Sequence, residues 1–448
     1  MRKHLEHRSR MSICTDHDPK TPSASFRMIS LDEARKIVLE VAQPLRVESV
    51  PLPVAQDHVI ADTVRAVEPV PAYRASIKDG YAVLSLDGPG EYPVVLECHA
   101  GIDPRASSLA AGSVAYVSTG GPLPEGADGV VQIEDTEQVG SGMVKILKQI
   151  RTGEDVREIG SDMCPGEVVM EKGEYIGGAE VGMLATVGAK EVPVFRTPHV
   201  AVLSTGSEVE DPSVQDLTPG KVRDSNRCML LSAAGDVGAR VMDMGIARDS
   251  EEEIERAIDE AIAGGADVLI TSGGVSMGSK DYIKPILERK GTVHFGKICM
   301  KPGKPCTFAT IPVYDAALGH NRDVIVFGLP GNPVSALATF HLLVGPCLRQ
   351  LAGHPKPLSD TVHVTTTFPI TMDPQRPEYR RVRVQFVPDS SNPSSGSLLA
   401  YSTGGQISSR IMSFRGCNAL LCVPQKKGEL PPGTVLPAIL LATSTSVF

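Results

Sequence analysis

Residues 266–282 (ADVLITSGGVSMGSKDY) form a glycine loop between a strand and a helix, the segment best suited to chemistry in this chain. The apolar run predicts a buried strand that ends at Thr271, and we expect a helix to begin near Asp281. Gly273 and Gly274 let the backbone turn its N–H groups outward, which suits a phosphate or a related oxyanion. A plain strand-to-helix turn is the simpler explanation of the Gly-Gly pair taken alone.

Two catalytic motifs compete for the same loop. The segment GVSMG matches the G-x-S-x-G nucleophile elbow, with Ser276 as the nucleophile. However, Ser276 lies several residues beyond the expected strand end, and the sequence has no HGGG-type oxyanion loop. The Walker pattern G-x-x-x-x-G-K-[ST] is absent as well. The sequence therefore favours an anion-binding loop over an acyl hydrolase or a P-loop NTPase.

A basic segment, KICMKPGKP (residues 297–305), places Lys297, Lys301 and Lys304 on a short stretch stiffened by two prolines. Three ammonium groups held close together repel one another, so this arrangement costs stability unless an anion or an acidic partner compensates the charge. The segment is therefore a candidate anion site. A solvated basic turn explains it equally well.

Two more strand-to-helix loops have the same character. In FGLPGNPVSALATF (327–340), Pro333 suits a first helical turn and Ser335 lies near the positive end of the helix. LSTGSE (203–208) ends in Glu208, where a ribose or a metal could be bound. Plain turns remain the alternative for both loops.

Isolated aspartates give weaker signals. Asp79 lies in KDGYAV, where Asp-Gly favours a tight hairpin turn, and Asp249 precedes a helix whose start it could cap. The segment 118–128 (STGGPLPEGAD) is a long glycine- and proline-rich loop. From the residues alone, structural roles are preferred at all of these positions.

The surrounding pattern predicts which elements position these loops. Residues 28–198 alternate short β-branched runs with glycine and proline and contain one early helix capped by Ser30 and Glu33. Residues 199–353 alternate continuous apolar strands with helices, one of which begins at Ser250. This alternation predicts a doubly wound parallel sheet, whose loops at the carboxyl edge bind ligands. A small all-β domain is expected after Pro355, and residues 1–27 are expected to form a disordered tail.

Composition excludes several classes of function. The 448 residues, enough for about three domains, carry a net charge of −9, and tryptophan is absent, which argues against a nucleic-acid surface. The nine cysteines form no CxxC pair, so we expect a reduced, cytoplasmic chain. The N-terminus lacks the apolar core of a secretory signal, and no uninterrupted apolar run is long enough to span a membrane.

Taken together and in order, a set of segments resembles the molybdenum insertases, also called molybdopterin molybdotransferases. These segments are SIKDGYAV, VSTGGPLPEGADGVVQIED, LSTGSE, VRDSN, LITSGGVSMGSKDY, MKPGKP and GLPGNPVSALATF. The resemblance runs from about residue 28 to the C-terminus and is greatest to the E-domain form found in gephyrin and in the plant cofactor-synthesis protein. It implies an elongated homodimer whose active cleft lies between chains. The implied subdomains are a linker (28–47 and 160–198), a β-rich insert (48–159), the doubly wound molybdopterin-binding domain (199–353) and a C-terminal β-barrel (354–448).

The resemblance also implies a reaction. Adenylated molybdopterin and molybdate enter, the phosphoanhydride is cleaved, molybdenum joins the dithiolene and AMP leaves, with Mg²⁺ as the expected cation. Because no adenylylating G domain is attached to this chain, a separate molybdopterin adenylyltransferase is the expected partner. Contact with cytoskeletal proteins is a further expectation of this kind.

Residue-by-residue matching to the family assigns roles to named positions. The catalytic candidates are Asp281, Asp249, Asp79, Ser276 and Glu208. Those for molybdopterin, AMP or molybdate are Lys297, Lys301, Lys304, Ser335, Thr119, Gly273, Gly274, Arg381 and Ser408. Those for Mg²⁺ are Asp281, Asp249 and Asp162. The chain departs from the family pattern at Gly405, where histidine is usual, and at Ser279-Lys280, where a more acidic pair is usual.

Two other functions fit the same resemblance. One is a gephyrin-like scaffold that clusters receptor peptides, because one fold can carry both roles. The other is a molybdopterin adenylyltransferase. The retained lysines and aspartates favour the enzyme over a scaffold, and the insert and barrel count against the adenylyltransferase.

Overall fold

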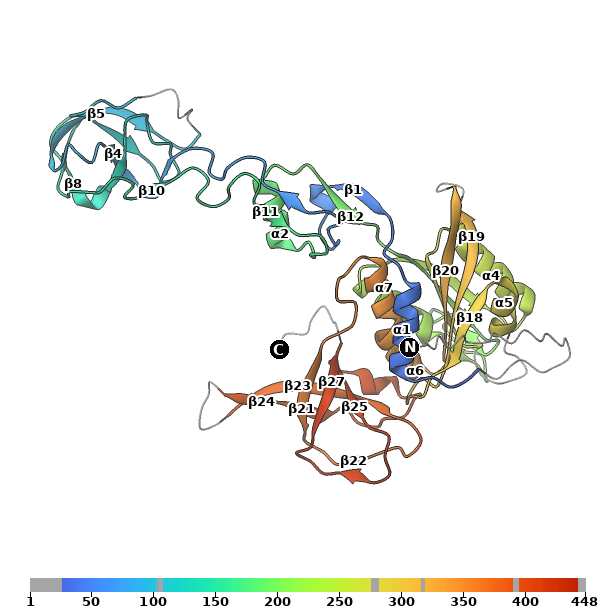
Figure 1. Cartoon of the computed structure of the whole chain (residues 1–448). Coiled ribbons are helices and arrows are strands. Elements are labelled where there is room, and N and C mark those ends of the chain that lie inside the picture. The colour runs from blue at the N-terminus through green and yellow to red at the C-terminus, as the bar shows by residue number, and fades with distance from the viewer. Residues whose placement is uncertain are drawn as a thin grey trace, which may run out of the picture.

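The computed structural model describes residues 26–101, 103, 108–274, 282–315, 319–389 and 395–441. An α/β domain and a β-barrel lie together, and a narrow arm extends from them to a distant β-rich insert (Figure 1). The expected fold class, α/β with additional β domains, is confirmed.

The α/β domain is built on a six-stranded sheet of order β16-β13-β17-β20-β19-β18. The strands are β13 (His199–Thr205), β16 (Arg240–Ala247), β17 (Val268–Ser272), β18 (Thr292–Lys297), β19 (Pro305–Asp315) and β20 (His320–Leu329). The first four strands in the sheet are parallel, as predicted, whereas β19 and β18 are antiparallel. Their connections are too short for a helical crossover, so these strands can only form hairpins.

Helices cover both faces of this sheet. They are α1 (Leu31–Val41), α3 (Ser225–Asp236), α4 (Glu251–Ala263), α5 (Ile283–Lys290), α6 (Pro333–Thr339) and α7 (Gly345–Leu351), with the π-helix η4 (Phe340–Val344) between the last two. Alternate residues of β13 face opposite cores: Val200 and Val202 pack with α1, α3, α6 and α7, and Ala201 and Leu203 pack with α4 and α5. Ser30 and Ser250 cap α1 and α4 as their positions predict.

The stretch Pro333–Leu351 is long and apolar enough to cross a membrane, but 78% of it is buried inside the structure. Its apolar side chains, among them Phe340, Leu343 and Leu348, belong to the core that also contains α1. It is therefore the central helix of the α/β core.

The arm begins where β1 (Val47–Pro51) pairs with β12 (Glu191–Phe195), near the helices η1 (Leu52–Val54) and α2 (Gly178–Thr186). Next along it, β2 (Val64–Arg65) pairs with β11 (Val168–Met170), and β3 (Ala75–Ser76) pairs with β10 (Val156–Arg157). The insert at its end is a second six-stranded sheet of order β7-β4-β6-β5-β9-β8. These strands are β4 (Gly80–Val83), β5 (Gly90–Cys98), β6 (Val114–Val117), β7 (Gly129–Gln132), β8 (Thr136–Gln138) and β9 (Met143–Ile146), with η3 (Ile133–Asp135).

The C-terminal domain is a closed barrel of order β21-β24-β23-β25-β27 with its own apolar core. Its elements are β21 (Thr361–Thr366), β23 (Glu378–Pro388), β24 (Gly396–Ser402), β25 (Ala419–Val423) and β27 (Val435–Leu440), with the pair β22 (Ile370–Thr371) and β26 (Glu429–Leu430) and the short helix η5 (Ile411–Phe414).

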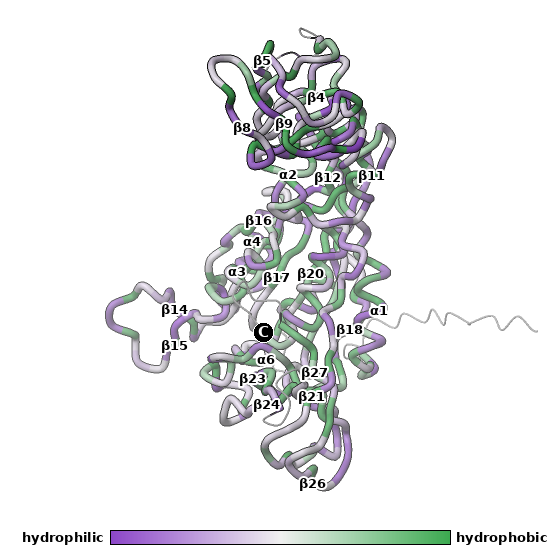
Figure 2. The backbone as a smooth tube through the Cα atoms, turned by 90° about the vertical axis from the view of Figure 1, so that its left-hand side faces the viewer, coloured by the Kyte–Doolittle hydropathy of each residue, from purple (hydrophilic) through white to green (hydrophobic). Residues whose placement is uncertain are grey.

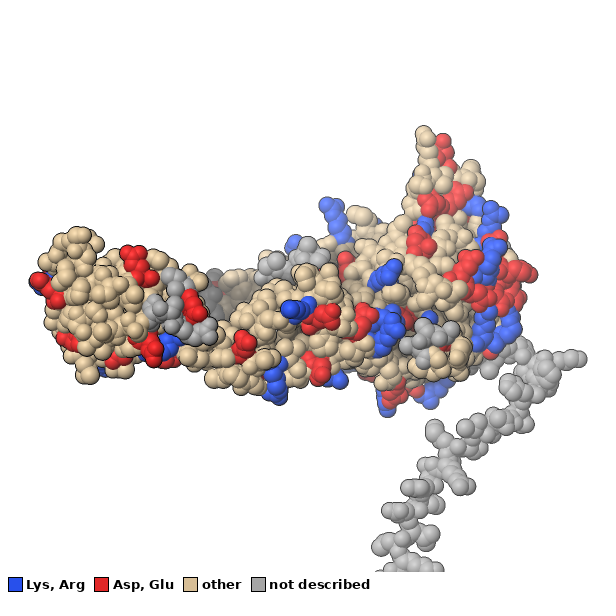
Figure 3. All heavy atoms as spheres, turned by 90° about the horizontal axis from the view of Figure 1, so that it is seen from above, with Lys and Arg blue, Asp and Glu red and all other residues tan. Residues whose placement is uncertain are grey.

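Two surface features stand out from this framework. The segment between β14 (Val209–Glu210) and β15 (Val222–Arg223) projects away from the α/β domain (Figure 2). Acidic and basic side chains intermingle at the end of the molecule that carries α4 and α5 (Figure 3), where Arg289 pairs with Glu251 and Glu255, and Lys290 with Asp259. These charges balance one another locally.

Candidate functional site

A pocket of about 330 Å³ lies at the carboxyl edge of the parallel strands. Three strand-to-helix loops meet there, from β13, β17 and β20, together with the start of α3. Its lining includes Thr205, Glu208, Asn226, Gly273, Gly331 and Pro333. The structure thus brings together three of the loops that the sequence singles out.

Close backbone packing makes glycine necessary where these loops meet. Gly273 has a φ of +90°, and a Cβ atom there would lie 2.6 Å from the carbonyl oxygen of Thr205. Gly274 also has a positive φ, and a Cβ atom on Gly331 would lie 3.8 Å from the Cα atom of Gly273. Side chains at Gly273 or Gly274 would strain the backbone, whereas Gly331 is in ordinary van der Waals contact with Gly273.

An ion-pair network centred on the buried Asp224 and Arg227 lies beside the pocket. Asp224, 2% exposed, accepts hydrogen bonds from Ser204 Oγ at 2.8 Å and from Arg227 Nε at 2.9 Å. Arg227 also pairs with Asp211 and Asp243. Burial alone would lower the pKa of Arg227, but its bonds to Asp243 and Asp224 raise it. The start of α3 is therefore fixed rigidly beside the pocket.

Asp249 fixes the loop that follows β13. Its carboxylate accepts a hydrogen bond from Ser207 N at 3.2 Å, and its own N–H donates to Ser207 Oγ at 3.1 Å. Glu208 lies in the same loop, with its carboxylate folded back over Gly206. The structure thus holds two predicted acidic residues on neighbouring loops, Glu208 after β13 and Asp249 after β16, and joins these loops through Ser207.

The basic segment contacts the barrel. Lys301 Nζ lies 3.4 Å from Asp373 Oδ2 and 3.6 Å from Glu378 Oε1, and its backbone N–H donates to the carbonyl of Pro377. Lys304 is exposed. Acidic side chains of the same chain thus balance the positive charge of Lys301. An acidic partner was one of the two ways in which the repulsion among the lysines could be offset, the other being a bound anion.

Arg381 is the most unusual polar residue in the barrel. It is 0% exposed, its Nε donates to Ser413 Oγ at 3.1 Å, and neither Nη1 nor Nη2 has a partner in the described part of the chain. Burial lowers the pKa of Arg381 to about 10, so the guanidinium remains charged at neutral pH. A buried cation with free donors would be stabilised by an anion that reached it.

The barrel loop that contacts Arg381 also contacts α6. Gln406 accepts a hydrogen bond from the backbone N–H of Arg381 at 3.0 Å, and the carbonyl of Ser408 accepts one from Val334 N at 3.2 Å. Ser335 follows in α6 and is 5% exposed. The structure therefore brings Ser408 and Ser335 together, and Pro333 of the same helix lines the pocket.

Other predicted residues lie far from this edge within one chain. Thr119 N donates to Asp79 Oδ1 at 2.7 Å, so these two residues are close to each other, but both belong to the distant insert (Figure 1). Asp162 forms an ion pair with Arg157 of β10, at the insert end of the arm. A single chain does not bring them to the pocket.

The predicted magnesium ligands do not form a cluster among the residues that the structure describes. No group of three acidic, histidine or cysteine side chains there could hold a metal ion. Ser276 and Asp281 lie outside the described residues. Mg²⁺ characteristically uses one or two carboxylates together with substrate phosphates and needs no such cluster, so magnesium binding by Asp249 and Asp162 stays a prediction.

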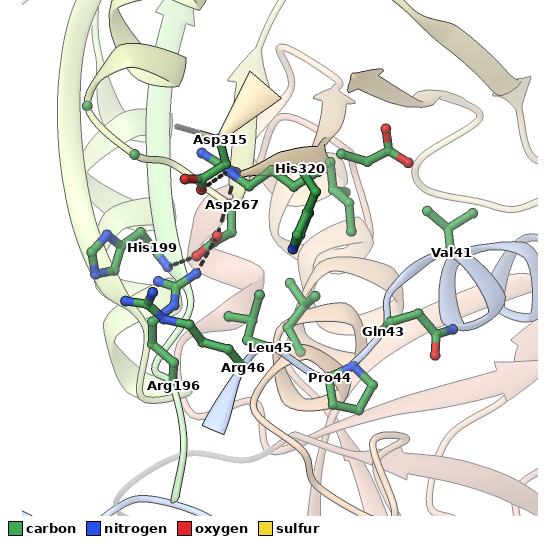
Figure 4. Close-up of a pocket in the computed structure, with 16 residues that line it drawn as sticks. Val41, Gln43, Pro44, Leu45, Arg46, Arg196, His199, Asp267, Asp315 and His320 are labelled. Carbon is green, nitrogen blue, oxygen red and sulfur yellow. Dashed lines mark hydrogen bonds and ion pairs between the residues drawn. The ribbon is translucent and has the colours of Figure 1, made fainter. Parts of the chain in front are cut away.

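Sequence reasoning missed the role of Asn226 and the network around Asp224. The segment VRDSN contributes to the resemblance, yet its only local signal is an Asp before a helix, which predicts the cap observed at Asp224. A second pocket, of about 620 Å³, was also missed (Figure 4). It lies at the opposite edge of the sheet, where the buried Asp267 contacts Arg196 and Arg322.

Comparison with known proteins agrees with this architecture. Three family models match: the MoeA N-terminal region (domains I and II) over 29–188, a probable molybdopterin binding domain over 201–350, and the MoeA C-terminal region (domain IV) over 363–441. The MoeA protein from Pyrococcus horikoshii has a similar structure, with a TM-score of 0.74, 29% sequence identity, and coverage of 92% of this chain and 99% of that one.

Curated relatives extend from bacteria to animals. Gephyrin from Dictyostelium discoideum is 36% identical over 93% of this chain, and the chain spans only 63% of gephyrin's length. The Drosophila melanogaster protein cinnamon is 34% identical, with coverage of 95% of this chain and 67% of its own. Molybdopterin molybdenumtransferase 2 from Mycobacterium tuberculosis is 32% identical, with coverage of 91% and 98%. Sequence, fold and domain order together show that the chain belongs to the MoeA family.

Proposed function

We propose that this chain is a molybdopterin molybdotransferase of molybdenum cofactor biosynthesis. It inserts molybdate into adenylated molybdopterin, cleaves the phosphoanhydride and releases AMP. The observation that carries this proposal is the fully buried guanidinium of Arg381, which has two unpartnered nitrogen atoms and contacts the barrel loop that reaches α6. Bacterial relatives named molybdopterin molybdenumtransferase support the same reaction. Neither the scaffold nor the adenylyltransferase is better supported.

In this proposal, adenylated molybdopterin and molybdate bind on different sides of α6. The pocket of Glu208, Gly273 and Gly331 takes the adenylated molybdopterin, whose phosphates suit backbone N–H groups. Arg381, Ser408 and Ser335 take the molybdate. Lys301 and Lys304 attract both anions, and Lys297 extends the basic surface along β18. The substrate thus spans the start of α6 and presents its dithiolene to the molybdate.

Asp249, Glu208 and Asp281 act on the phosphoanhydride in this account. Asp249 and Asp281 would hold Mg²⁺ beside the phosphates, and the cation would offset their charge. Ser276 is proposed as a further contact of the same loop. The family resemblance supports each of these roles, and for Asp249 and Glu208 the hydrogen bonds between Asp249 and Ser207, which join their two loops, support it as well.

The proposed active site needs residues from two chains. We infer a homodimer in which Asp79 and Thr119, carried on the distant arm, reach the pocket of the partner chain. Asp162, at the insert end of the arm, would take part from there as well. A separate adenylyltransferase supplies the substrate in the cytoplasm, where the free cysteines observed at the described positions remain reduced.

The test is AMP release by the purified chain. We expect AMP to form from adenylated molybdopterin when molybdate and Mg²⁺ are present. Lys301→Ala should weaken substrate use about 10-fold or more, since a charge-assisted contact contributes about 1.5 to 3 kcal/mol. A folded parental chain that leaves adenylated molybdopterin intact would reject the proposal.

A further inference from the structure

Asn226 is a nearly buried amide at the junction of three loops. It is the second residue of α3 and is 8% exposed, and it lines the 330 Å³ pocket. Its Nδ2 donates to Ser272 Oγ at 2.7 Å and to the carbonyl oxygen of Gly331 at 2.8 Å. Ser272 ends β17, and Gly331 lies between β20 and α6. One amide group therefore ties α3 to the loops of two neighbouring parallel strands.

The orientation of this amide is fixed. Flipping it would direct Oδ1 at the carbonyl oxygen of Gly331, and two acceptors repel each other. In the observed orientation Oδ1 is buried and has no partner among the residues described. An unsatisfied buried acceptor is a cost to stability. The unpaired Oδ1 of Asn226 therefore lowers the stability of the fold, whereas its Nδ2 holds two loops together.

The loops that it joins line the 330 Å³ pocket. Gly273 follows Ser272 directly, and its N–H donates to the carbonyl of Leu329 at 3.1 Å, across the same junction. Gly331 lies beside Gly273 in ordinary van der Waals contact. Asn226 thus adds two side-chain hydrogen bonds to a junction that one backbone hydrogen bond already spans, and the spacing of the two turns should depend on both.

We propose that Asn226 is a positioning residue, which sets the spacing of the 273–274 and 331–333 turns and so the shape of the substrate pocket. It acts through backbone placement and needs no contact with the ligand. The identity of that ligand rests on the proposed function, whereas the tie between the loops does not.

The matched control is Asn418 in the barrel. Its Nδ2 donates to the carbonyl of Val384 at 2.9 Å, and its Oδ1 accepts from Val384 N at 2.7 Å. Both amide atoms are thus satisfied, and the residue lies away from the pocket. Asn418→Ala should lower the melting temperature, whereas Asn226→Ala should lower it less, because it removes an unsatisfied acceptor and places alanine in a helix.

The deciding measurement is amide hydrogen exchange at Gly273 in the full chain. Asn226→Ala should speed this exchange about tenfold, the effect of losing one or two hydrogen bonds, and Asn418→Ala should leave it unchanged. Asn226→Leu, which has a similar size but no polar atoms, should behave like the alanine variant and serves if that variant folds poorly. Parental exchange at Gly273 in a folded Asn226 variant would overturn the proposal.

A kinetic measurement follows the consequence for the ligand. In AMP release, Asn226→Ala should raise the KM for adenylated molybdopterin about tenfold relative to Asn418→Ala, with a smaller change in kcat. A parental chain without AMP release would reject the proposed function, and Gly273 exchange would still decide the role of Asn226. Faster exchange with a parental KM would overturn the link to pocket shape.

Discussion

At the scale of single residues, Arg381 shows how burial and charge compete. A buried guanidinium with unpaired nitrogen atoms is costly, and the cost falls when an anion binds it. The same logic makes Lys301 different, because Asp373 and Glu378 already balance its charge. Two cations of one candidate site thus differ in how strongly they need an anion.

Replacement of Arg381 tests this difference. Arg381→Met should keep or raise the melting temperature, because it removes unpaired buried donors worth about 1 to 3 kcal/mol each when unsatisfied. Molybdate, which should stabilise the parental chain by about 2.7 kcal/mol at a hundred times its Kd, should no longer do so. Thermal unfolding with and without molybdate measures both effects.

The control is Arg383→Met, which replaces an exposed arginine of the same strand that stacks on Tyr401. A marked loss of stability in Arg381→Met, with molybdate still protective, would contradict the account.

A second residue-scale prediction concerns His341 of the π-helix. Burial, with a further contribution from the positive charge of Arg349, lowers the pKa of His341 to about 4. The unfolded chain therefore binds this proton near pH 6.5 and the folded chain only near pH 4, so stability falls as the pH drops through that range. Between pH 7 and 5 this residue should account for a loss of about 2 kcal/mol. His341→Gln should lose less stability over this range in urea unfolding. Equal losses would mean that His341 is protonated without penalty.

The sequence predicts residue types at the site better than their partners. Lysines, glycines and Arg381 follow from the motifs and the resemblance. The carboxylates that balance Lys301 come from the barrel, far along the chain, and no local spacing signals such a pairing. Asn226 was missed for the same reason, since both of its acceptors belong to other loops.

At the scale of elements, the alternation of strands and helices is enough to predict the parallel part of the sheet. It does not predict the antiparallel pair β18 and β19, because continuous apolar runs look alike in either direction. The helix α1 is predicted by its cap and apolar spacing, yet its packing against α7 depends on contacts between opposite ends of the chain. Local patterns therefore specify the elements, and tertiary contacts specify their neighbours.

Asp267 at the opposite sheet edge allows a test at this scale. Its carboxylate accepts from Arg196 at 2.6 Å and from His199 N at 2.8 Å, and it joins the end of the arm to β17 (Figure 4). Asp267→Ala should cost about 3 kcal/mol in urea unfolding, because it leaves buried donors and a cation unpaired. The control Glu251→Ala breaks an exposed pair with Arg289 at 2.8 Å and should change stability little. Similar effects of both changes would show that Asp267 is not a structural clamp.

At the scale of the whole molecule, the arm is the feature that the pocket alone does not explain. It carries Asp79 and Thr119 away from the pocket of their own chain, so the proposed site needs a second chain. In the proposed two-fold dimer, each site would receive the arm of the partner. The site then consists of two halves that can be inactivated separately.

Mixing variants tests this arrangement. An Asp79→Ala chain mixed with a Lys301→Ala chain should regain about a quarter of the parental AMP release, because half of randomly paired dimers are mixed and each has one intact site. Asp79→Ala mixed with Thr119→Ala should regain none, because both changes affect the same half. Activity should be compared before and after subunit exchange. No recovery in the first pair would place the site within one chain, and recovery in the control pair would place Asp79 and Thr119 in different halves of the site.

In the proposed function, one reaction couples cleavage of the phosphoanhydride to molybdenum insertion. The direct measurement is the amount of AMP and of molybdenum-loaded molybdopterin formed together by the purified chain from adenylated molybdopterin, Mg²⁺ and molybdate. The account predicts equal amounts of the two products from the parental chain and no loaded product from Arg381→Met. AMP release without molybdenum incorporation, or equal incorporation by Arg381→Met, would contradict it.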